Sequence, residues 1–284
     1  MKRGALYVVA TPLGNLEDVT LRALRVLREV DLIAAEDTRR TRILLGHHGI
    51  ATPVTSYYDA VERQRAPRLV ADLVAGKSIA LVSDAGTPGI ADPGYHLVRG
   101  ALAAGVTVVP VPGASAPVAL VSVAGVPTER FCFEGFLPPR GAARARRLAE
   151  LAGERRAIVL LEAGRRLPAL LDAATEAFGA RDAVVGRELT KRYEEVLRGT
   201  LPELAARVRA AGAVRGEVTV LIAARAGEQA GQDLDDAAIE ARLHSMLGAG
   251  SSVRDAASAV ARETGRSRRD LYQRALALGR GQPR

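Results

Sequence analysis

The chain has 284 residues, of which 48% are hydrophobic, and its 40 Lys and Arg residues outnumber 32 Asp and Glu residues for a net charge of +8. This apolar fraction excludes a disordered chain, and the length predicts about two domains. The positive charge is compatible with a nucleic-acid partner, although an arginine excess is also typical of a GC-rich genome.

The few cysteines and histidines argue against a disulfide-stabilised protein and against a metal-binding protein. Cys132 is the single cysteine, so neither a disulfide framework nor a cysteine-based zinc site is expected, and the four histidines are too scattered for a metal cluster. No apolar stretch approaches the length of a membrane span, and the N-terminus leads directly into an expected strand rather than a signal peptide. We therefore expect a soluble, cytoplasmic protein without a membrane partner.

The first 124 residues alternate short apolar runs with segments of helical period, which predicts a mostly parallel α/β sheet. The expected strands are residues 5–10, 32–35, 54–58, 79–82 and 106–111. The expected helices are residues 18–30, one that opens at 36–40, and residues 63–75, 95–104 and 117–124. Asp18 or Thr20 is a suitable cap for the first helix, and Ser115 for the last.

The alternation restarts after a break. Strands are expected at residues 130–134, 158–161, 183–187, 194–197 and 217–223, and helices at 142–152, 167–177 and near 202–211. Residues 225–232 form a polar linker. The sequence thus predicts an N-terminal α/β domain at 1–116 and a second α/β domain at 117–228.

The tail at 234–284 differs in kind, because it contains three helical patterns, at residues 234–247, 253–263 and 268–278. The last two are joined by a glycine turn, which is the pattern of a helix-turn-helix. From residue 251 on, the sequence contains eight arginines and three acidic residues. A contact with nucleic acid or the ribosome and a small capping bundle with a solvated charged face are both compatible with this pattern.

Residues 83–94, which follow the expected strand at 79–82, read S-D-A-G-T-P-G-I-A-D-P-G. A glycine-rich loop at the carboxyl end of a parallel strand is where open α/β sheets bind ligands. Gly86, Gly89 and Gly94 let the backbone approach a ligand closely. A tight surface turn would also explain this central loop alone, but two similar loops follow the strands at 5–10 and 106–111, and they favour a ligand site.

Several motifs together resemble one family. They are Y-V-V-A-T-P-L-G-N at 7–15, A-E-D-T-R-R-T at 35–41, the central loop, V-P-G-A-S-A at 111–116, F-E-G-F-L-P-P at 133–139 and R-E-L-T-K at 187–191. In this order and spacing they resemble the tetrapyrrole-methylase superfamily, and within it the branch that methylates ribosomal RNA. The resemblance covers residues 5 to about 224, and the tail is similar to the small helical extension of that branch.

The resemblance implies two α/β domains with a cofactor cleft between them, a small C-terminal helical extension, and a homodimer. It implies S-adenosyl-L-methionine as cofactor and 2′-O-methylation of a cytidine near the decoding centre of 16S rRNA in the small ribosomal subunit. The broader superfamily has a glycine-rich first loop and a central Gly-Asp-Pro. This chain has T-P-L-G-N at 11–15 and G-T-P at 86–88, and both departures point away from tetrapyrrole substrates.

The resemblance also implies cofactor contacts, because loop backbones with small residues leave N–H and C=O groups open to adenosine and to an amino-acid group. From the first domain these are Pro12, Leu13, Asp84, Ala85, Gly86, Thr87, Ile90, Ala114 and Ser115. From the second domain they are Leu161, Leu189 and Val218. Asp84 is suited to neutralise an ammonium group, to hold a loop amide or to cap a turn.

A ribose hydroxyl is a poor nucleophile when neutral, and a general base contributes about 10²–10⁴-fold. Candidate bases are Glu36, Asp37, Asp92 and Glu162. The sequence does not choose among them, each could instead be a structural hydrogen-bonding group, and positioning without a base is an alternative. The motifs indicate neither a magnesium nor a zinc site.

Basic and aromatic side chains flank the same loops. Candidate contacts to rRNA phosphates are Arg39, Arg40, Arg140, Arg187 and Lys191, each of which also suits a solvated or dimer-interface position. Tyr57 and Tyr58 could stack on an extruded base or pack in the core.

Two other functions compete with rRNA methylation. Methylation of a small molecule such as a corrin precursor is opposed by the basic tail and by the loop at 11–14. A module that binds RNA without chemistry has the tail as its only support and leaves the three ligand-type loops unexplained.

Overall fold

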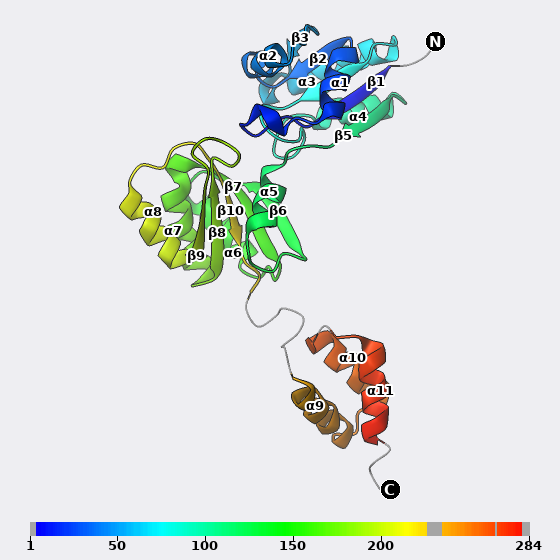
Figure 1. Ribbon diagram of the computed structural model, residues 1–284, viewed down its shortest axis with the longest axis vertical. Coiled ribbons are helices and arrows are strands. Elements are labelled where there is room, and N and C mark those ends of the chain that lie inside the picture. The colour runs from blue at the N-terminus through cyan, green and yellow to red at the C-terminus, as the bar shows by residue number, and fades with distance from the viewer. Residues whose placement is uncertain (1–3, 226–234, 265, 280–284) are drawn as a thin grey trace. The chain divides into compact units, whose positions relative to one another are not determined.

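The computed structural model describes residues 4–225, 235–264 and 266–279. The chain divides into two compact units, Met1–Ala223 and Ala224–Arg284 (Figure 1). Apart from Arg225, the predicted linker at 225–232 lies outside the described residues, as do the predicted boundaries at 228 and 234. Within the described ranges, no helix is long and apolar enough to cross a membrane.

The first sheet holds five parallel strands in the order β3-β2-β4-β1-β5. The strands are β1 (Ala5–Val9), β2 (Leu32–Ala35), β3 (Val54–Ser56), β4 (Ile79–Val82) and β5 (Thr107–Val111). The helices between them are α1 (Leu21–Glu29), α2 (Thr38–His47), α3 (Asp59–Val74) and α4 (Tyr95–Ala103). The predicted parallel sheet is confirmed.

Each face of this sheet has its own core. Apolar side chains of α1 and α2 pack on one face, and those of α3 and α4 pack on the other. Strands covered on both faces are expected to be continuously apolar, as in β4, where all four residues are buried.

The second sheet is mixed, in the order β6-β7-β10-β8-β9, and only β6 and β7 are parallel. Its strands are β6 (Phe131–Phe136), β7 (Ala157–Ala163), β8 (Asp182–Arg187), β9 (Glu195–Thr200) and β10 (Glu217–Ile222). The helices α6 (Gly141–Leu151), α7 (Leu167–Phe178) and α8 (Leu201–Ala211) cover one face. The apolar helix α5 (Ala116–Val123) packs on the other, together with Leu13 from the first loop.

Two predicted helix starts were wrong. The first helix begins at Leu21 instead of residue 18, because the Thr20 side chain accepts a hydrogen bond from the Ala23 amide and caps it, while Leu16–Asp18 forms a separate 3-10 turn. The helix α3 begins at Asp59, one turn before the predicted 63, and β3 ends at Ser56, so Tyr57 and Tyr58 lie outside the strand.

The first turn of α3 carries a buried carboxylate. Glu62 is 8% exposed and accepts hydrogen bonds from the amides of Gly94 and His96, which lie at the end of the central loop and the start of α4. The hydroxyl of fully buried Tyr57 donates to the same carboxylate. Tertiary contacts of this kind leave no mark on hydrophobic periodicity. They make Tyr57 a core residue, whereas Tyr58 is 43% exposed.

The second unit contains the three predicted helices, α9 (Asp236–Gly248), α10 (Val253–Thr264) and α11 (Arg268–Gly279). They enclose a small core of their own, formed by Ile239, Leu243, Ala256, Ala257, Val260, Leu271 and Ala275. Asp236 at the start of α9 pairs with Arg266 and Arg274, at 2.6 and 2.9 Å, and so ties the helices together at the surface.

Candidate functional site

Loops leave the carboxyl ends of β1, β2, β4 and β5 at one edge of the first sheet, because all its strands are parallel. β1 and β4 are neighbours, yet the helices that follow them, α1 and α4, pack on opposite faces. Such a switch point is where open α/β sheets bind ligands. The candidate site therefore lies between the first loop, residues 11–15, and the central loop, residues 83–94.

Hydrogen bonds join these loops. The amides of Thr11 and Gly86 each donate to the carbonyl of the other, at 2.8 and 2.9 Å, and the Thr11 hydroxyl donates to the Ser83 carbonyl at 3.0 Å. The Thr87 hydroxyl donates to the carbonyl of Ala114, in the loop after β5, at 3.2 Å. Gly86 has a φ of +89°, which favours glycine. The three predicted cofactor loops thus form one bonded unit.

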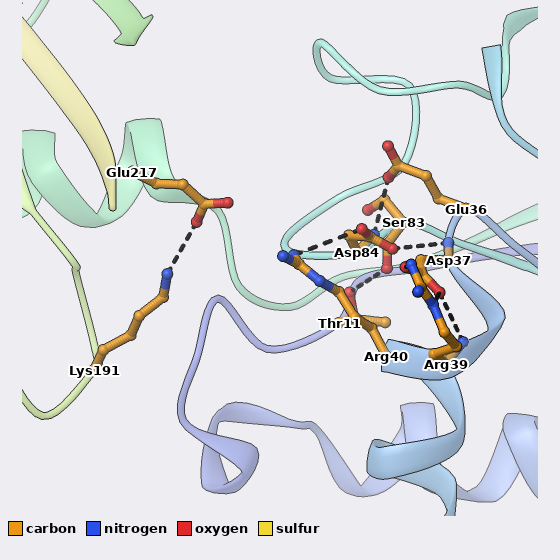
Figure 2. A network of polar contacts seen from close by, with 9 residues as sticks. All are labelled: Thr11, Glu36, Asp37, Arg39, Arg40, Ser83, Asp84, Lys191 and Glu217. Carbon is orange, nitrogen blue, oxygen red and sulfur yellow. Dashed lines mark hydrogen bonds and ion pairs between the residues drawn. The ribbon is translucent and has the colours of Figure 1, made fainter. Parts of the chain in front are cut away.

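The loop after β2 is bonded crosswise to the central loop (Figure 2). The Asp84 amide donates to Glu36 Oε2 at 3.1 Å, and Asp84 Oδ1 accepts from the Asp37 amide at 2.8 Å. Arg40 lies 3.6 Å from the other oxygen of Asp84. Asp84 thus holds a loop amide, one of the three roles considered for it.

The candidate bases of the first sheet differ in their affinity for a proton. Burial raises the pKa of Asp92 to about 7, and the neighbouring Glu36 carboxylate adds to the shift. Burial also raises the pKa of Glu36. In contrast, a hydrogen bond from the Arg39 guanidinium holds the pKa of Asp37 well below its usual range. Asp92 and Glu36 are therefore the stronger bases of the three.

Glu162 lies in a closed ion pair of the second sheet. It is 1% exposed. Its carboxylate accepts hydrogen bonds from Arg144 at 3.3 Å, from Arg166 at 2.5 Å and from the Ala163 amide at 2.9 Å. Arg144 also donates to the carbonyls of the two prolines at 138 and 139. This geometry makes Glu162 the anchor of the loop after β6 rather than an accessible base.

An apolar wall borders the bonded loops. The predicted cofactor residues Leu13, Ala85, Ala114 and Leu189 pack in a single cluster on the second sheet. Pro12 is buried beside them. An apolar wall next to exposed loop amides and carbonyls is the usual lining of a small-molecule site, and it suits a heteroaromatic base with polar edges.

Other predicted cofactor residues lie elsewhere. The Val218 side chain is packed in the core under α6, α7 and α8, on the face away from the apolar wall, and its backbone is paired with β7 and β8. Leu161 is half-buried and is paired in the sheet with Phe136 and Thr219. Ile90, at the tip of the central loop, is 46% exposed. Ser115 is half-buried at the N-cap position of α5.

Four of the five predicted phosphate contacts are paired with carboxylates. The pairs are Arg39 with Asp37, Arg40 with Asp84, Arg187 with Glu195, and Lys191 with both Glu188 and Glu217. The side chains of Arg39 and Arg40 remain 85% and 58% exposed, which leaves donors for a further anion. Arg140 is exposed at the N-cap position of α6.

Lys191 holds the second-sheet side of the site (Figure 2). Its Nζ lies 3.0 Å from Glu188 Oε1 and 3.1 Å from Glu217 Oε2. Burial works to lower the pKa of Lys191, but these hydrogen bonds outweigh it and raise the pKa. The stem of Lys191 crosses the first loop so closely that a methyl group added at Gly14 would lie 2.2 Å from Lys191 Cγ.

The sequence reasoning did not single out Thr11, Ser83, Phe136 or Arg144. Thr11 and Ser83 lie in the motifs at 7–15 and 83–94, but a single hydroxyl residue in such a motif has no pattern that marks it. Arg144 is one of several arginines in α6, and only the structure shows that it is 4% exposed. Phe136 could have been found from the sequence, because it is an aromatic residue next to a proline-rich loop, where few neighbours are expected to bury it.

Comparison with known proteins identifies two families along the chain. Residues 5–205 match the family "Tetrapyrrole (Corrin/Porphyrin) Methylases". Residues 233–279 match "RsmI C-terminal HTH domain", where HTH denotes helix-turn-helix. The two matches together account for both compact units.

Curated relatives are similar over nearly their full length. A protein of Pseudomonas aeruginosa named ribosomal RNA small subunit methyltransferase I is 46% identical, with 97% of this chain and 98% of the relative covered. A protein of the same name from Mesorhizobium japonicum is 44% identical, with 96% and 92% covered.

Solved structures share the fold at lower identity. The methyltransferase CobJ has a TM-score of 0.60 at 20% identity, with 80% of this chain and 97% of that chain covered. A uroporphyrin-III C-methyl transferase from Thermus thermophilus, complexed with S-adenyl homocysteine, has a TM-score of 0.55 at 19% identity, with 77% and 97% covered.

Proposed function

The chain belongs to the tetrapyrrole (corrin/porphyrin) methylase family, within the group of ribosomal RNA small subunit methyltransferase I, and we propose that it methylates the 2′-oxygen of a cytidine in the decoding region of 16S rRNA. The methyl donor is S-adenosyl-L-methionine. The observation that carries this proposal is the bonded set of loops at the switch point of the first sheet, in a chain 44–46% identical to these relatives.

The residues at this edge fit the methyl donor. When bound, S-adenosylmethionine supplies a methyl group on a positively charged sulfur. We assign its adenosine to the apolar wall of Leu13, Ala85, Ala114 and Leu189, with its polar edges on the backbone of the central loop. The bonds between the loops fix this wall before the donor arrives, which lowers the entropy cost of binding.

We propose Asp92 as the general base. A base is most effective when its pKa lies near the working pH, and the pKa of Asp92 is about 7. Above this pH its carboxylate can take the proton of the ribose hydroxyl, whereas Asp37 is too weak a base and Glu162 is buried by its cation partners. Glu36 acts through its charge, which helps to keep the pKa of Asp92 high.

We further propose that the substrate is the assembled small subunit, that the protein is a homodimer and that it acts in the cytoplasm. Apolar side chains on α4 and α5 support a second copy of the chain as partner, since Tyr95, Leu102 and Val118 are 62, 60 and 57% exposed. The alternative substrate, a corrin precursor, is disfavoured by the helix-turn-helix unit, which such a small molecule does not need.

The test is methyl transfer from labelled S-adenosylmethionine to assembled small subunits, naked 16S rRNA and a corrin precursor. We expect label at the 2′-oxygen of a decoding-region cytidine in the subunits, located by mapping the modified nucleotide. Label confined to the corrin precursor would overturn the proposal. Equal rates on naked rRNA and on subunits would remove the requirement for an assembled particle.

A further inference from the structure

The end of β6 lies against the tip of the central loop. The pairing of β6 with β7 shifts register between Phe133 and Gly135, which marks a bulge. Gly135 has a φ of +65°, and a methyl group added there would lie 3.6 Å from the Ala91 Cβ. Ala91 directly precedes the proposed base, Asp92. Gly135 therefore lies beside the central loop, and Phe136 is the next residue along the strand.

Phe136 is 54% exposed, although its neighbours Phe131 and Phe133 are partly buried against the apolar cluster. The ring borders a hollow of about 210 Å³, which is also lined by Pro138, Arg146, Arg147 and other residues of this segment. Sites for whole drug-sized ligands are usually about 300–1,000 Å³, so this hollow is suited to a smaller planar group. An aromatic wall with arginines beside it is typical of surfaces that stack a nucleobase.

The polar groups of the hollow are already ordered. Arg147 donates to Glu134 at 2.6 Å and to Glu150 at 2.7 Å, so its guanidinium is held in place between two carboxylates. Arg146 is exposed on the same helix turn. The loop between β6 and α6 is anchored from below by the buried pair of Arg144 and Glu162. A rigid platform of this kind loses little entropy when a ligand stacks on it.

We propose that Phe136 and Arg146 form a stacking subsite for one unpaired base of the RNA substrate, next to the methylated nucleotide. The inference rests on the proposed function and extends it to a named base contact. The ring stacks on the base, and the Arg146 guanidinium meets the flanking phosphate. An unpaired nucleotide matches this subsite, because its base can stack on the aromatic ring and its phosphate can pair with the arginine.

The chain has no tryptophan, so Phe136→Trp introduces a single indole at the subsite. We expect its fluorescence to be quenched, saturably, when assembled small subunits are added, because a stacked base quenches indole emission. Val74→Trp is the matched control. Val74 is 40% exposed at the end of α3, which leads to the amino end of β4 on the opposite edge of the sheet, and its indole should not respond.

Phe136→Leu keeps an apolar side chain but removes the aromatic face. We expect its KM for small subunits to rise about five- to 150-fold, the range for removal of one stacked base. Phe136→Tyr should stay close to the parent. Affinity for S-adenosylhomocysteine and the midpoint of thermal unfolding should change little in both variants, since neither the cofactor wall nor a core is altered.

A parent-like KM for Phe136→Leu, or an indole that responds to protein concentration but not to subunits, would overturn the subsite while leaving the proposed function intact. The latter result would identify this face as a protein contact. If the parent chain bound S-adenosylhomocysteine yet labelled no rRNA, the proposed function itself would fail, and the subsite with it.

Discussion

At the scale of single residues, Asp92 is the group whose charge matters most. Its folded-state pKa of about 7 lies above the usual 3.8, so the native state holds the proton more tightly than the unfolded state. The stability that this proton provides is present below pH 4 and is lost as the pH rises through 7. Above pH 7 the ionised carboxylate opposes folding, which is the cost of a base kept partly out of water.

We predict that Asp92→Asn raises the midpoint of thermal unfolding at pH 8 and leaves it unchanged at pH 4. The expected gain is about 2–4 °C, which corresponds to roughly 1 kcal/mol in a chain of this size after allowance for solvent screening. Methyl transfer by the parent should rise with pH through about 7, and the variant should lose this rise together with at least about 100-fold in rate.

Asp37→Asn is the matched control, because it removes a carboxylate from the neighbouring loop that is paired with exposed Arg39. It should leave the pH profile of methyl transfer in place. An unchanged profile in Asp92→Asn would show that Asp92 is not the base, and would favour positioning without a dedicated base.

The sequence singled out the loops that the structure bonds together, but it could not rank their carboxylates. The sequence pattern puts Asp37, Asp92 and Glu162 after a strand or in a loop, so they look alike in the chain, although the structure places Glu162 inside β7. They differ in what surrounds them. Asp37 pairs with an exposed arginine, Glu162 pairs with buried Arg144 and half-buried Arg166, and Asp92 is surrounded mostly by buried groups and other carboxylates. For Asp92 the difference depends on burial and on the Glu36 carboxylate of another loop, which no local sequence pattern records.

At the scale of secondary-structure elements and loops, the contact between Gly14 and Lys191 sets how the first loop meets the loop after β8. A methyl group added at Gly14 would overlap the stem of Lys191, whose Nζ is held by two carboxylates, so a larger residue there would require the lysine to shift. The first loop is in turn bonded to Gly86 of the central loop. We predict from these contacts that Lys191 positions the cofactor loops, whereas the sequence predicted a phosphate contact for it.

We predict that Gly14→Ala weakens the binding of S-adenosylhomocysteine about tenfold and lowers the unfolding midpoint, because overpacking costs about 1–3 kcal/mol. Adding Lys191→Ala to the same chain should restore much of the affinity for S-adenosylhomocysteine and of the unfolding midpoint, since it removes the overlapping stem. Calorimetric titration and thermal unfolding measure the two effects in a double-mutant cycle.

Gly46→Ala serves as the control for replacing a glycine. Gly46 lies in α2, and an added methyl group there meets no atom within 4 Å, so cofactor binding should be unchanged. If Gly14→Ala and Lys191→Ala acted independently, the two loops would not be coupled. If Lys191→Ala weakened only RNA binding, Lys191 would be a phosphate ligand after all.

Element types were predictable throughout, while several boundaries were not. The apolar runs at 32–35 and 79–82 match β2 and β4 to the residue, because buried parallel strands are apolar at every position. In the second sheet, β9 was predicted at 194–197 but spans Glu195–Thr200, where every residue pairs with β8. Its residues 198–200, R-G-T, have no apolar pattern, so ladder pairing rather than hydropathy extends the strand.

At the scale of the whole molecule, the open question is what the second unit contributes. It has its own core, so it does not need the first unit to bury its apolar side chains. Arg268 and Arg269 are exposed in the first turn of α11, the second helix of the helix-turn-helix pair. In such pairs the first residues of the second helix contact the nucleic acid. The fold therefore favours the RNA contact over the capping bundle that the sequence left as an alternative.

We predict that replacing both Arg268 and Arg269 with Gln weakens binding to small subunits and lowers the slope of log affinity against log salt by about 0.7–0.9 for each phosphate that the variant no longer neutralises. The matched control replaces Arg25 and Arg156 with Gln. Both arginines are exposed and paired with Glu29 and Glu154, and the net charge of the control variant changes by the same amount as that of the test variant. S-adenosylhomocysteine affinity should stay constant in both variants, because the cofactor loops belong to the first unit. Equal slopes in the two double variants would show that only net charge matters, and that the second unit is a capping bundle.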